Sequence, residues 1–219
     1  MLFPTLYPAR VLKREKRFRL YVDFTGEETV AYLPNPGRLQ EIIYEGAKVL
    51  LKKVDDLSRR TSLEAVVGFA HGKIPVGLNA SLANKVFLEN IEKIFPFTEK
   101  VKAEFVFEDS RFDFLINKEV LVEVKSCTLV EGGTGLFPDA PTMRGTRHLQ
   151  TLLRWPFKKA LVFVVQRGDA KKVMPNYSMD PEFGKAMREL FGSLDYKVAF
   201  TCEVCEKGIF FKEFIPVSL

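Results

Sequence analysis

Two short runs that alternate apolar and polar residues flank a polar turn near the middle of the chain. The first runs from Arg111 to Leu115 (RFDFL), the second runs from Val122 to Ser126 (VEVKS), and NKE at 117–119 lies between them. Alternation with a period of two is typical of half-buried β-strands, and a short polar segment suits a hairpin loop. The sequence therefore predicts a β-hairpin here.

The register of this hairpin would bring two acidic side chains together. When the strands are paired outward from the loop, Asp113 lies opposite Glu123, and Lys125 follows Glu123 on the same face. Directly opposed residues have Cβ atoms about 5 Å apart, and two residues along a strand span about 6.6 Å. The other face is predicted to be apolar and buried, with Phe112, Phe114, Ile116, Val120, Val122 and Val124.

Two carboxylates and a lysine in one patch have a chemical use. Adjacent carboxylates repel each other unless a hard cation such as Mg²⁺ or Mn²⁺ lies between them. Such an ion activates water and stabilises the charge that develops on a phosphodiester, and a lysine adds positive charge. We predict Asp113 and Glu123 as metal ligands and, with Lys125, as catalytic residues. The alternative is an amphipathic hairpin whose charged face meets solvent.

Residues 1–78 are predicted to form a strand-rich domain. Strand-like segments at 16–24, 28–33, 48–54, 61–70 and 74–76 are separated by turn signals, and a short helical segment spans 39–44. Five short strands with little helix favour a small barrel, of which an OB-like barrel is the best match.

Residues 79–219 alternate predicted helices and strands, so the whole chain is predicted to be α+β. Helices are expected at 81–94, 143–154 and 181–191, strands at 102–107, 111–116, 120–126, 160–165, 197–203 and 209–214, and a glycine-rich loop around 132–135. The order helix, three strands, helix, strand matches the core of the PD-(D/E)XK nuclease superfamily. We therefore predict an α/β nuclease-like domain with a mixed central sheet, in which the carboxylates lie on the second and third strands.

Composition is that of a globular protein with a modest basic excess. The 219 residues are 47% hydrophobic and 28% charged, with a formal net charge of +5. No apolar stretch approaches the ~20 residues needed to span a bilayer, and MLFPT at the start lacks signal-peptide features. We expect a cytoplasmic location, no membrane association and no small-molecule cofactor, while the positive charge suits a polyanionic partner.

Basic residues are concentrated in two regions that we predict to bind DNA. They are Arg14, Lys16, Arg17, Arg38, Arg59 and Arg60 in the N-terminal domain, and Arg144, Arg147 and His148 on one face of the helix at 143–154. Aromatic residues (Phe18, Tyr21, Phe24 and Tyr32) lie among the first group. Basic grooves with aromatic platforms suit single-stranded nucleic acid. The alternatives are core aromatic residues and a solvated helix face.

Three cysteines, two of them in a C-x-x-C at 202–205, are not followed by a second pair. The spacing does not support zinc, and redox use is not expected, because the motif ends a strand-like run rather than beginning a helix. Buried thiols or a disulfide remain open.

Blocks along nearly the whole chain resemble the sugar fermentation stimulation protein A family. They include LFP at 2–4, PNPG at 34–37, VGLN at 76–79, the RFDFL and VEVK runs, FPDA at 137–140 and FVVQR at 163–167. The resemblance implies an N-terminal OB-like domain, a C-terminal PD-(D/E)XK nuclease-like domain and DNA binding. It also implies Asp113 and Glu123 as metal ligands, with Lys125 as the catalytic base or charge stabiliser.

Two functions follow from these observations. The first is a Mg²⁺- or Mn²⁺-dependent nuclease that hydrolyses phosphodiester bonds in DNA. The second is a non-catalytic, regulatory DNA-binding protein on a nuclease scaffold, linked to sugar metabolism. The choice between DNA and RNA, and between single-stranded, duplex and branched substrates, stays open.

Overall fold

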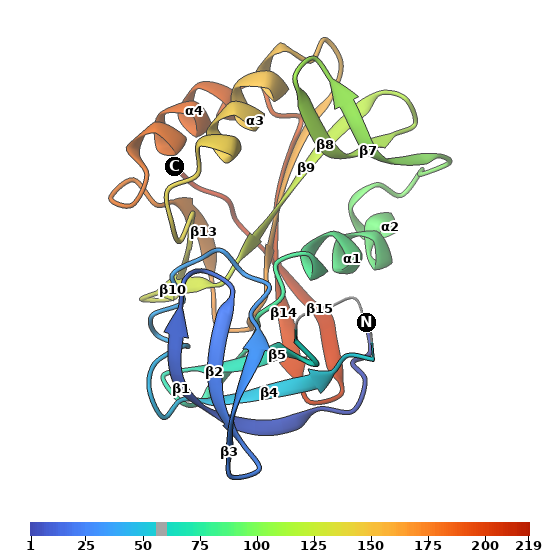
Figure 1. Ribbon diagram of the computed structural model, residues 1–219. Helices are drawn as coiled ribbons and strands as arrows, with labels where there is room; N and C mark the ends of the chain where they lie inside the picture. The colour runs from blue at the N-terminus through green and yellow to red at the C-terminus, as the bar shows by residue number, and fades with distance from the viewer. Residues whose placement is uncertain (56–60) are drawn as a thin grey trace.

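The computed structural model describes residues 1–55 and 61–219 as two β-rich halves stacked on each other (Figure 1). The first six strands are β1 (Tyr7–Glu15), β2 (Arg19–Phe24), β3 (Glu27–Tyr32), β4 (Lys48–Lys53), β5 (Leu63–Ala70) and β6 (Ile74–Gly77). They pair in the order β3-β2-β1-β4-β5-β6, and a parallel bridge between Tyr32 and Glu64 joins β3 to β5. Five strands thus close into the predicted barrel.

The remaining elements begin at Leu82. They are α1 (Leu82–Glu89), α2 (Ile91–Ile94), β7 (Val101–Phe107), β8 (Ser110–Ile116), β9 (Val120–Cys127), β10 (Leu129–Glu131), β11 (Thr134–Phe137), α3 (Met143–Arg154), β12 (Lys159–Val165), β13 (Lys172–Pro175), α4 (Pro181–Phe191), β14 (Tyr196–Cys205) and β15 (Gly208–Ile215). Six of these strands form one sheet in the order β15-β14-β12-β9-β8-β7, in which β9, β12 and β14 are parallel. The predicted mixed sheet is confirmed.

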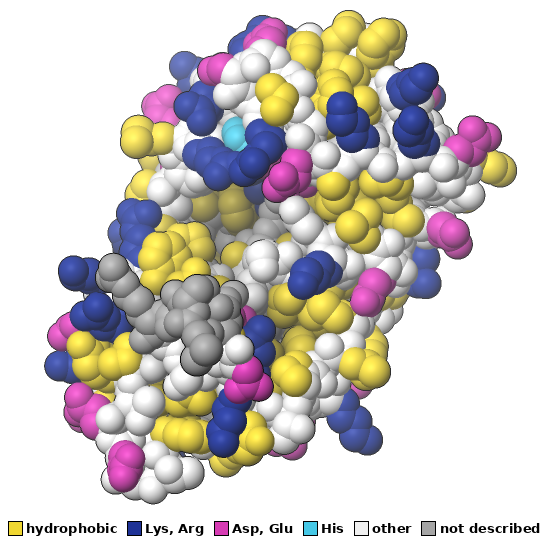
Figure 2. All heavy atoms as spheres, turned by 45° about the vertical axis from the view of Figure 1, so that its right-hand side comes forward, with side chains coloured by type: hydrophobic (Ala, Val, Ile, Leu, Met, Phe, Trp, Pro, Cys, Tyr) yellow, Lys and Arg dark blue, Asp and Glu magenta, His cyan; other side chains and the backbone are white. Residues whose placement is uncertain are grey.

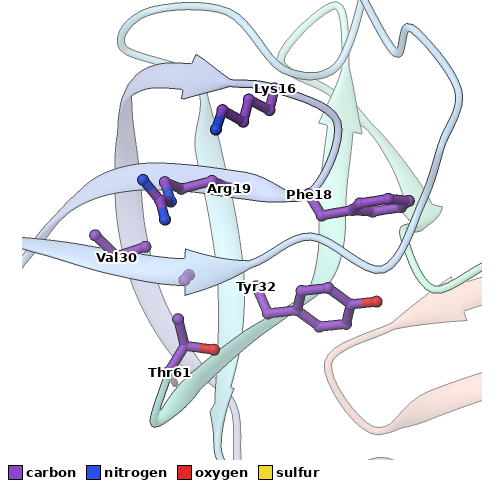
Figure 3. A pocket seen from close by; sticks show the side chains of 7 residues that line it. Lys16, Phe18, Arg19, Val30, Tyr32 and Thr61 are labelled. Atoms are coloured by element: carbon purple, nitrogen blue, oxygen red, sulfur yellow. The ribbon is translucent and has the colours of Figure 1, made fainter. Parts of the chain in front are cut away.

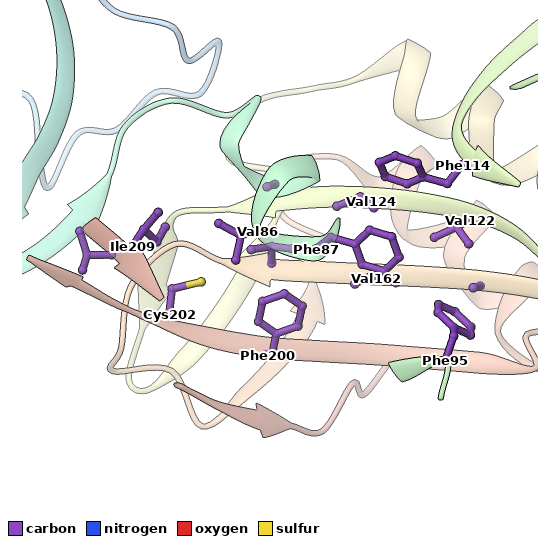
Figure 4. Close-up of a cluster of buried hydrophobic side chains, with 14 of the residues drawn as sticks. Val86, Phe87, Phe95, Phe114, Val122, Val124, Val162, Phe200, Cys202 and Ile209 are labelled. Atoms are coloured by element: carbon purple, nitrogen blue, oxygen red, sulfur yellow. The ribbon is translucent and has the colours of Figure 1, made fainter. Parts of the chain in front are cut away.

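Helices cover both faces of this sheet. On one face Val86 and Phe87 of α1 pack on Val124, Val162 and other buried sheet residues (Figure 4). On the other face α3 and α4 bury a second apolar cluster, which includes Leu149 and Phe183. Strand β9 is therefore covered on both sides, as its run of buried residues indicates.

Two predictions for the barrel are wrong. Residues 16–18 do not begin a strand but form the turn between β1 and β2. Lys16 adopts a φ of 56° in this turn. The segment 39–44 is a turn rather than a helix. The Ile43 N–H donates to the Leu39 carbonyl (2.8 Å), as in one turn of helix. The helical hydrogen bonds do not continue, because the Gly46 N–H donates to the Val11 carbonyl of β1 instead.

The second half differs from the prediction in three places. The helix expected at 81–94 is interrupted at Asn90, whose side chain donates to the Val86 carbonyl (2.9 Å). The predicted glycine-rich loop is the β10–β11 hairpin, in which Gly132 and Gly133 adopt positive φ at the turn. Strand β13, which the sequence pattern did not indicate, pairs with β11. No helix in the described part of the chain is long and apolar enough to span a membrane.

Candidate active site

The predicted hairpin forms with the predicted register near its loop only. Ile116 pairs with Val120 and Phe114 pairs with Val122, but the ladder ends there. Beyond this point the Asp113 carboxylate takes the place of a strand partner, because its Oδ2 accepts the Val124 N–H at 2.8 Å. The predicted strand pair of Asp113 with Glu123 is therefore absent from the ladder. The two carboxylates nevertheless interact, because the negative charge of Glu123 raises the pKa of Asp113.

Glu123 is buried, and both of its hydrogen-bond partners lie at one carboxylate oxygen. Its Oε1 accepts from Lys125 Nζ at 2.6 Å and lies 2.7 Å from His148 Nδ1. Its Oε2 is buried without a hydrogen-bond partner among the described residues. Burial raises the pKa of Glu123, but the positive charge of Lys125 and the hydrogen bond from His148 outweigh it and leave the pKa lowered. Glu123 is therefore ionised at neutral pH, with one oxygen not yet used.

Asp113 lies beside it with a different electrostatic environment. Burial, and next the negative charge of Glu123, raise the pKa of Asp113, while hydrogen bonds from Val124 and Asn84 oppose the rise. Asn84 of α1 donates from Nδ2 to Asp113 Oδ1 at 2.7 Å. Sequence reasoning missed Asn84, because a lone Asn within a helix carries no signal until α1 is packed over β9.

His148 does not lie on an exposed basic face. Of the predicted residues of α3, Arg144 and Arg147 are exposed, but His148 is buried, since α3 packs against both the sheet and α4. Arg144 Nε lies 3.4 Å from His148 Nε2. With Arg144 donating to Nε2, Nδ1 carries the proton and donates to Glu123. His148 thus joins the carboxylate site, and its predicted contact with DNA stays untested.

Part of this cluster borders a cleft of about 390 Å³ between the two halves, whereas Glu123 and His148 are not among the residues that line it. Asp113, Asn84 and Lys125 line it from the sheet and α1, and Arg17 lines it from the barrel. Figure 2 shows a hollow between the two halves, with Lys and Arg side chains along its upper rim. The cleft is thus open to a ligand and has basic residues at its border.

The other predicted basic residues occupy different environments. Arg14 is half-buried and donates to the backbone carbonyls of Asn35, Arg17 and Arg38. Lys16 and Arg38 are exposed on the barrel. Arg59 and Arg60 lie outside the described residues. The structure therefore brings Arg17 to the cleft, gives Arg14 a role in holding a loop, and leaves Lys16 and Arg38 on the surface.

The residues fit a metal ion that is completed by other ligands. Two carboxylates, one with an unpartnered buried oxygen, are suitable donors for a hard cation. Within the described ranges, no group of three or more His, Cys, Asp and Glu side chains could hold an ion. Mg²⁺ is commonly bound through one or two carboxylates together with water and phosphate oxygens. Asp113 and Glu123 meet that requirement.

Comparison with known proteins identifies the family. The family model "Sugar fermentation stimulation protein RE domain" matches residues 81–208, and "SfsA N-terminal OB domain" matches residues 12–77. The chain belongs to the sugar fermentation stimulation protein family. A family homologue from Thermoanaerobacter sp. is 37% identical over 227 residues and covers 99% of this chain and 98% of its own. One from Caldanaerobacter subterraneus is 38% identical, with 96% of each chain covered.

A solved relative has the same fold. The structure of Pyrococcus furiosus SfsA in complex with Ca²⁺ matches with a TM-score of 0.88 at 26% identity, covering 100% of this chain and 98% of that one. The family resemblance and the barrel-plus-sheet fold predicted from the sequence are thereby confirmed.

Proposed function

We propose that this protein hydrolyses phosphodiester bonds in nucleic acid, with Mg²⁺ or Mn²⁺ as cofactor and DNA as the expected substrate. The observation that carries the proposal is Glu123, an ionised, buried carboxylate that keeps one oxygen without a partner next to a second carboxylate. A buried carboxylate oxygen without a hydrogen-bond partner is costly, and such an arrangement suits a site that a ligand completes.

Asp113 and Glu123 would hold the metal ion. The relative from Pyrococcus furiosus was solved in complex with Ca²⁺, another hard cation that prefers oxygen ligands. When bound, the ion supplies Lewis-acid stabilisation of a phosphoryl oxygen and a bound water of lowered pKa.

The protein's own side chains orient this site. Asn84 and the Val124 N–H fix the Asp113 carboxylate through both of its oxygens. His148 and Lys125 fix Glu123 through Oε1 alone. Its Oε2 therefore has no hydrogen-bond partner among the described residues and would be the oxygen that binds the ion. Lys125 also lines the cleft, where its ammonium group can stabilise negative charge on a phosphate oxygen.

A cleavage assay tests the proposal. Labelled single-stranded, duplex and branched DNAs are incubated with Mg²⁺, Mn²⁺ or EDTA, using wild type, Asp113→Ala and Glu119→Ala. Glu119 is an exposed acid at the loop of the same hairpin and serves as the matched control. We expect metal-dependent products from wild type and Glu119→Ala, and a loss of at least about 100-fold in Asp113→Ala. Equal cleavage by Asp113→Ala would contradict the assignment.

One observation favours a second function, a non-catalytic DNA-binding protein on this scaffold. Lys125 and His148 already partner Glu123, so its charge is partly balanced within the protein. This function predicts binding that weakens steeply with salt, because Lys and Arg displace counterions from phosphates. DNA that is bound but uncut in every metal, with affinity unchanged in Asp113→Ala, would favour it over the nuclease.

A further inference from the structure

Two aromatic rings lie in contact on the outside of the barrel. Phe18, in the β1–β2 turn, and Tyr32, at the end of β3, have ring centroids 6.1 Å apart and an interplanar angle of 37°. Their residues are 44% and 37% exposed. Large aromatic side chains usually bury their surface, so an exposed pair marks a place where another molecule can cover them.

The backbone presents these rings in a fixed position. Arg19 pairs with Tyr32 across β2 and β3, and the Leu33 N–H bonds to the Phe18 carbonyl at 2.9 Å. Leu33, the neighbour of Tyr32, is fully buried in the barrel core, so Tyr32 faces outward, and Phe18 lies in the exposed turn that precedes β2. Binding to the rings therefore requires little ordering of the protein, which favours affinity.

Cationic side chains complete the pocket around the rings. Lys16, Arg19, Phe18 and Tyr32 border a pocket of about 510 Å³. Figure 3 shows the two rings extending side by side, with Lys16 and Arg19 reaching to the other side of the pocket. Glu15 lies 3.9 Å from Arg19 and 3.4 Å from Lys13, so it balances part of this charge. Rings beside cations match a polyanion that carries flat apolar groups.

The pocket adjoins the carboxylate cleft through one turn. Arg17 lies between Lys16 and Phe18 in the sequence, yet it lines the cleft together with Asp113 and Lys125. Arg14 donates to the Arg17 carbonyl at 2.6 and 3.2 Å and holds this turn in place. Residues 16–18 therefore border both cavities.

We infer that the Phe18–Tyr32 pocket binds unpaired bases of a single-stranded polynucleotide whose backbone continues past Arg17 into the cleft. The bases stack on the two rings, and Lys16 and Arg19 contact the phosphates. In a duplex the base faces are already stacked on one another, so a duplex cannot use the rings. The continuation into the cleft rests on the proposed function, whereas binding at the rings does not.

The test measures binding of full-length protein in EDTA, where metal-dependent cleavage is absent. Labelled dT₁₅, U₁₅, a 15-base-pair duplex and an abasic 15-mer with the same number of phosphates are titrated by fluorescence anisotropy. The variants are Phe18→Ala, Tyr32→Ala, Phe18→Trp and Phe97→Ala. Phe97 is a matched control, because it is 88% exposed and borders neither cavity.

We expect wild type to bind dT₁₅ more tightly than the abasic strand and the duplex. Phe18→Ala and Tyr32→Ala should each weaken dT₁₅ binding about tenfold, as expected for loss of one stacked base, and leave abasic binding unchanged. Phe18→Trp should retain affinity, and Phe97→Ala should behave as wild type. A comparison of dT₁₅ with U₁₅ identifies which polynucleotide is preferred.

Three results would overturn the inference: equal binding of dT₁₅ and the abasic strand, tighter binding of the duplex, or equal losses in Phe18→Ala and Phe97→Ala. Thermal unfolding of each variant identifies any loss that comes from misfolding, and Tyr32→Ala then serves in place of an unfolded Phe18→Ala. Failure of the nuclease proposal looks different, because dT₁₅ would then bind through the rings and remain uncut when metal is added.

Discussion

The carboxylate cleft and the Phe18–Tyr32 pocket are built in opposite ways. At the carboxylate site, Glu123, Lys125 and His148 are buried, and Lys125 and His148 each form a hydrogen bond with Glu123. In the pocket, the rings are exposed and only their backbone is fixed. Side chains in the cleft therefore contribute to folding as well as to function, whereas those of the pocket are free to serve a ligand alone. The predictions below test this difference.

The largest difference should appear in stability when a lysine is removed from each region. Lys125→Met leaves Glu123 buried beside Asp113 without its cation, and breaking a buried pair in this way costs about 3 kcal/mol. Lys16→Met, at an exposed position of the pocket, should change the free energy of unfolding by less than about 0.5 kcal/mol. Guanidinium unfolding at pH 7 in EDTA measures both. Equal changes would show that the cleft is not an interlocked unit.

The next effect concerns catalysis at His148. Its hydrogen bond to Glu123 makes it a positioning residue, so His148→Ala should lower kcat about 10- to 100-fold with little change in KM. His148→Asn, which can donate from a similar position, should recover part of the loss. Steady-state cleavage with Mn²⁺ measures both parameters. A higher KM with unchanged kcat would instead place His148 in nucleic-acid binding, as the sequence pattern predicts.

A smaller effect should separate two arginines that the sequence does not distinguish. Arg14 donates to three backbone carbonyls, so Arg14→Ala should destabilise the protein by about 1–2 kcal/mol. Arg17 is exposed at the cleft, so Arg17→Ala should leave stability unchanged. It should reduce the slope of log affinity for single-stranded DNA against log salt by about 0.7, the value for one phosphate contact. Calorimetry and anisotropy at several salt concentrations check the pair. The reverse assignment of effects would contradict the structure.

The sequence predicts buried, periodic elements better than turns and surfaces. Helix α3 and helix α4 begin and end where their sequence patterns indicate, because caps at Thr142 and Asp180 and a regular apolar face define them. Strand β1 and the turn at 16–18 were missed, since their fold depends on pairing with β4 and on a left-handed Lys16. Those are tertiary contacts that no local pattern shows.

The site follows the same division. Strand alternation predicts that Asp113, Glu123 and Lys125 lie together. In the structure Asp113 and Lys125 line one cleft, and Glu123 accepts a hydrogen bond from Lys125. Asn84 and the buried state of His148 could not be predicted, because both depend on how α1 and α3 pack against the sheet. Basic character alone also could not separate Arg14 from Arg17.

The smallest expected effect concerns two buried cysteines, which we expect not to react in the folded protein. They test whether burial by itself makes a side chain reactive. All three cysteines are free, and burial raises the pKa of Cys127 and of Cys202 from the usual 9.0 to about 12. Because the folded state keeps these thiols protonated, their contribution to stability is complete below about pH 9 and falls as the pH rises toward 12.

At pH 8 iodoacetamide should therefore leave both cysteines unmodified in the native protein and label them in guanidinium, as peptide mass spectrometry will show. Rapid native labelling would mean that the interior opens readily. Protection would show that burial makes a thiol inert, whereas Glu123 stays ionised because the charge of Lys125 and the hydrogen bond from His148 lower its pKa.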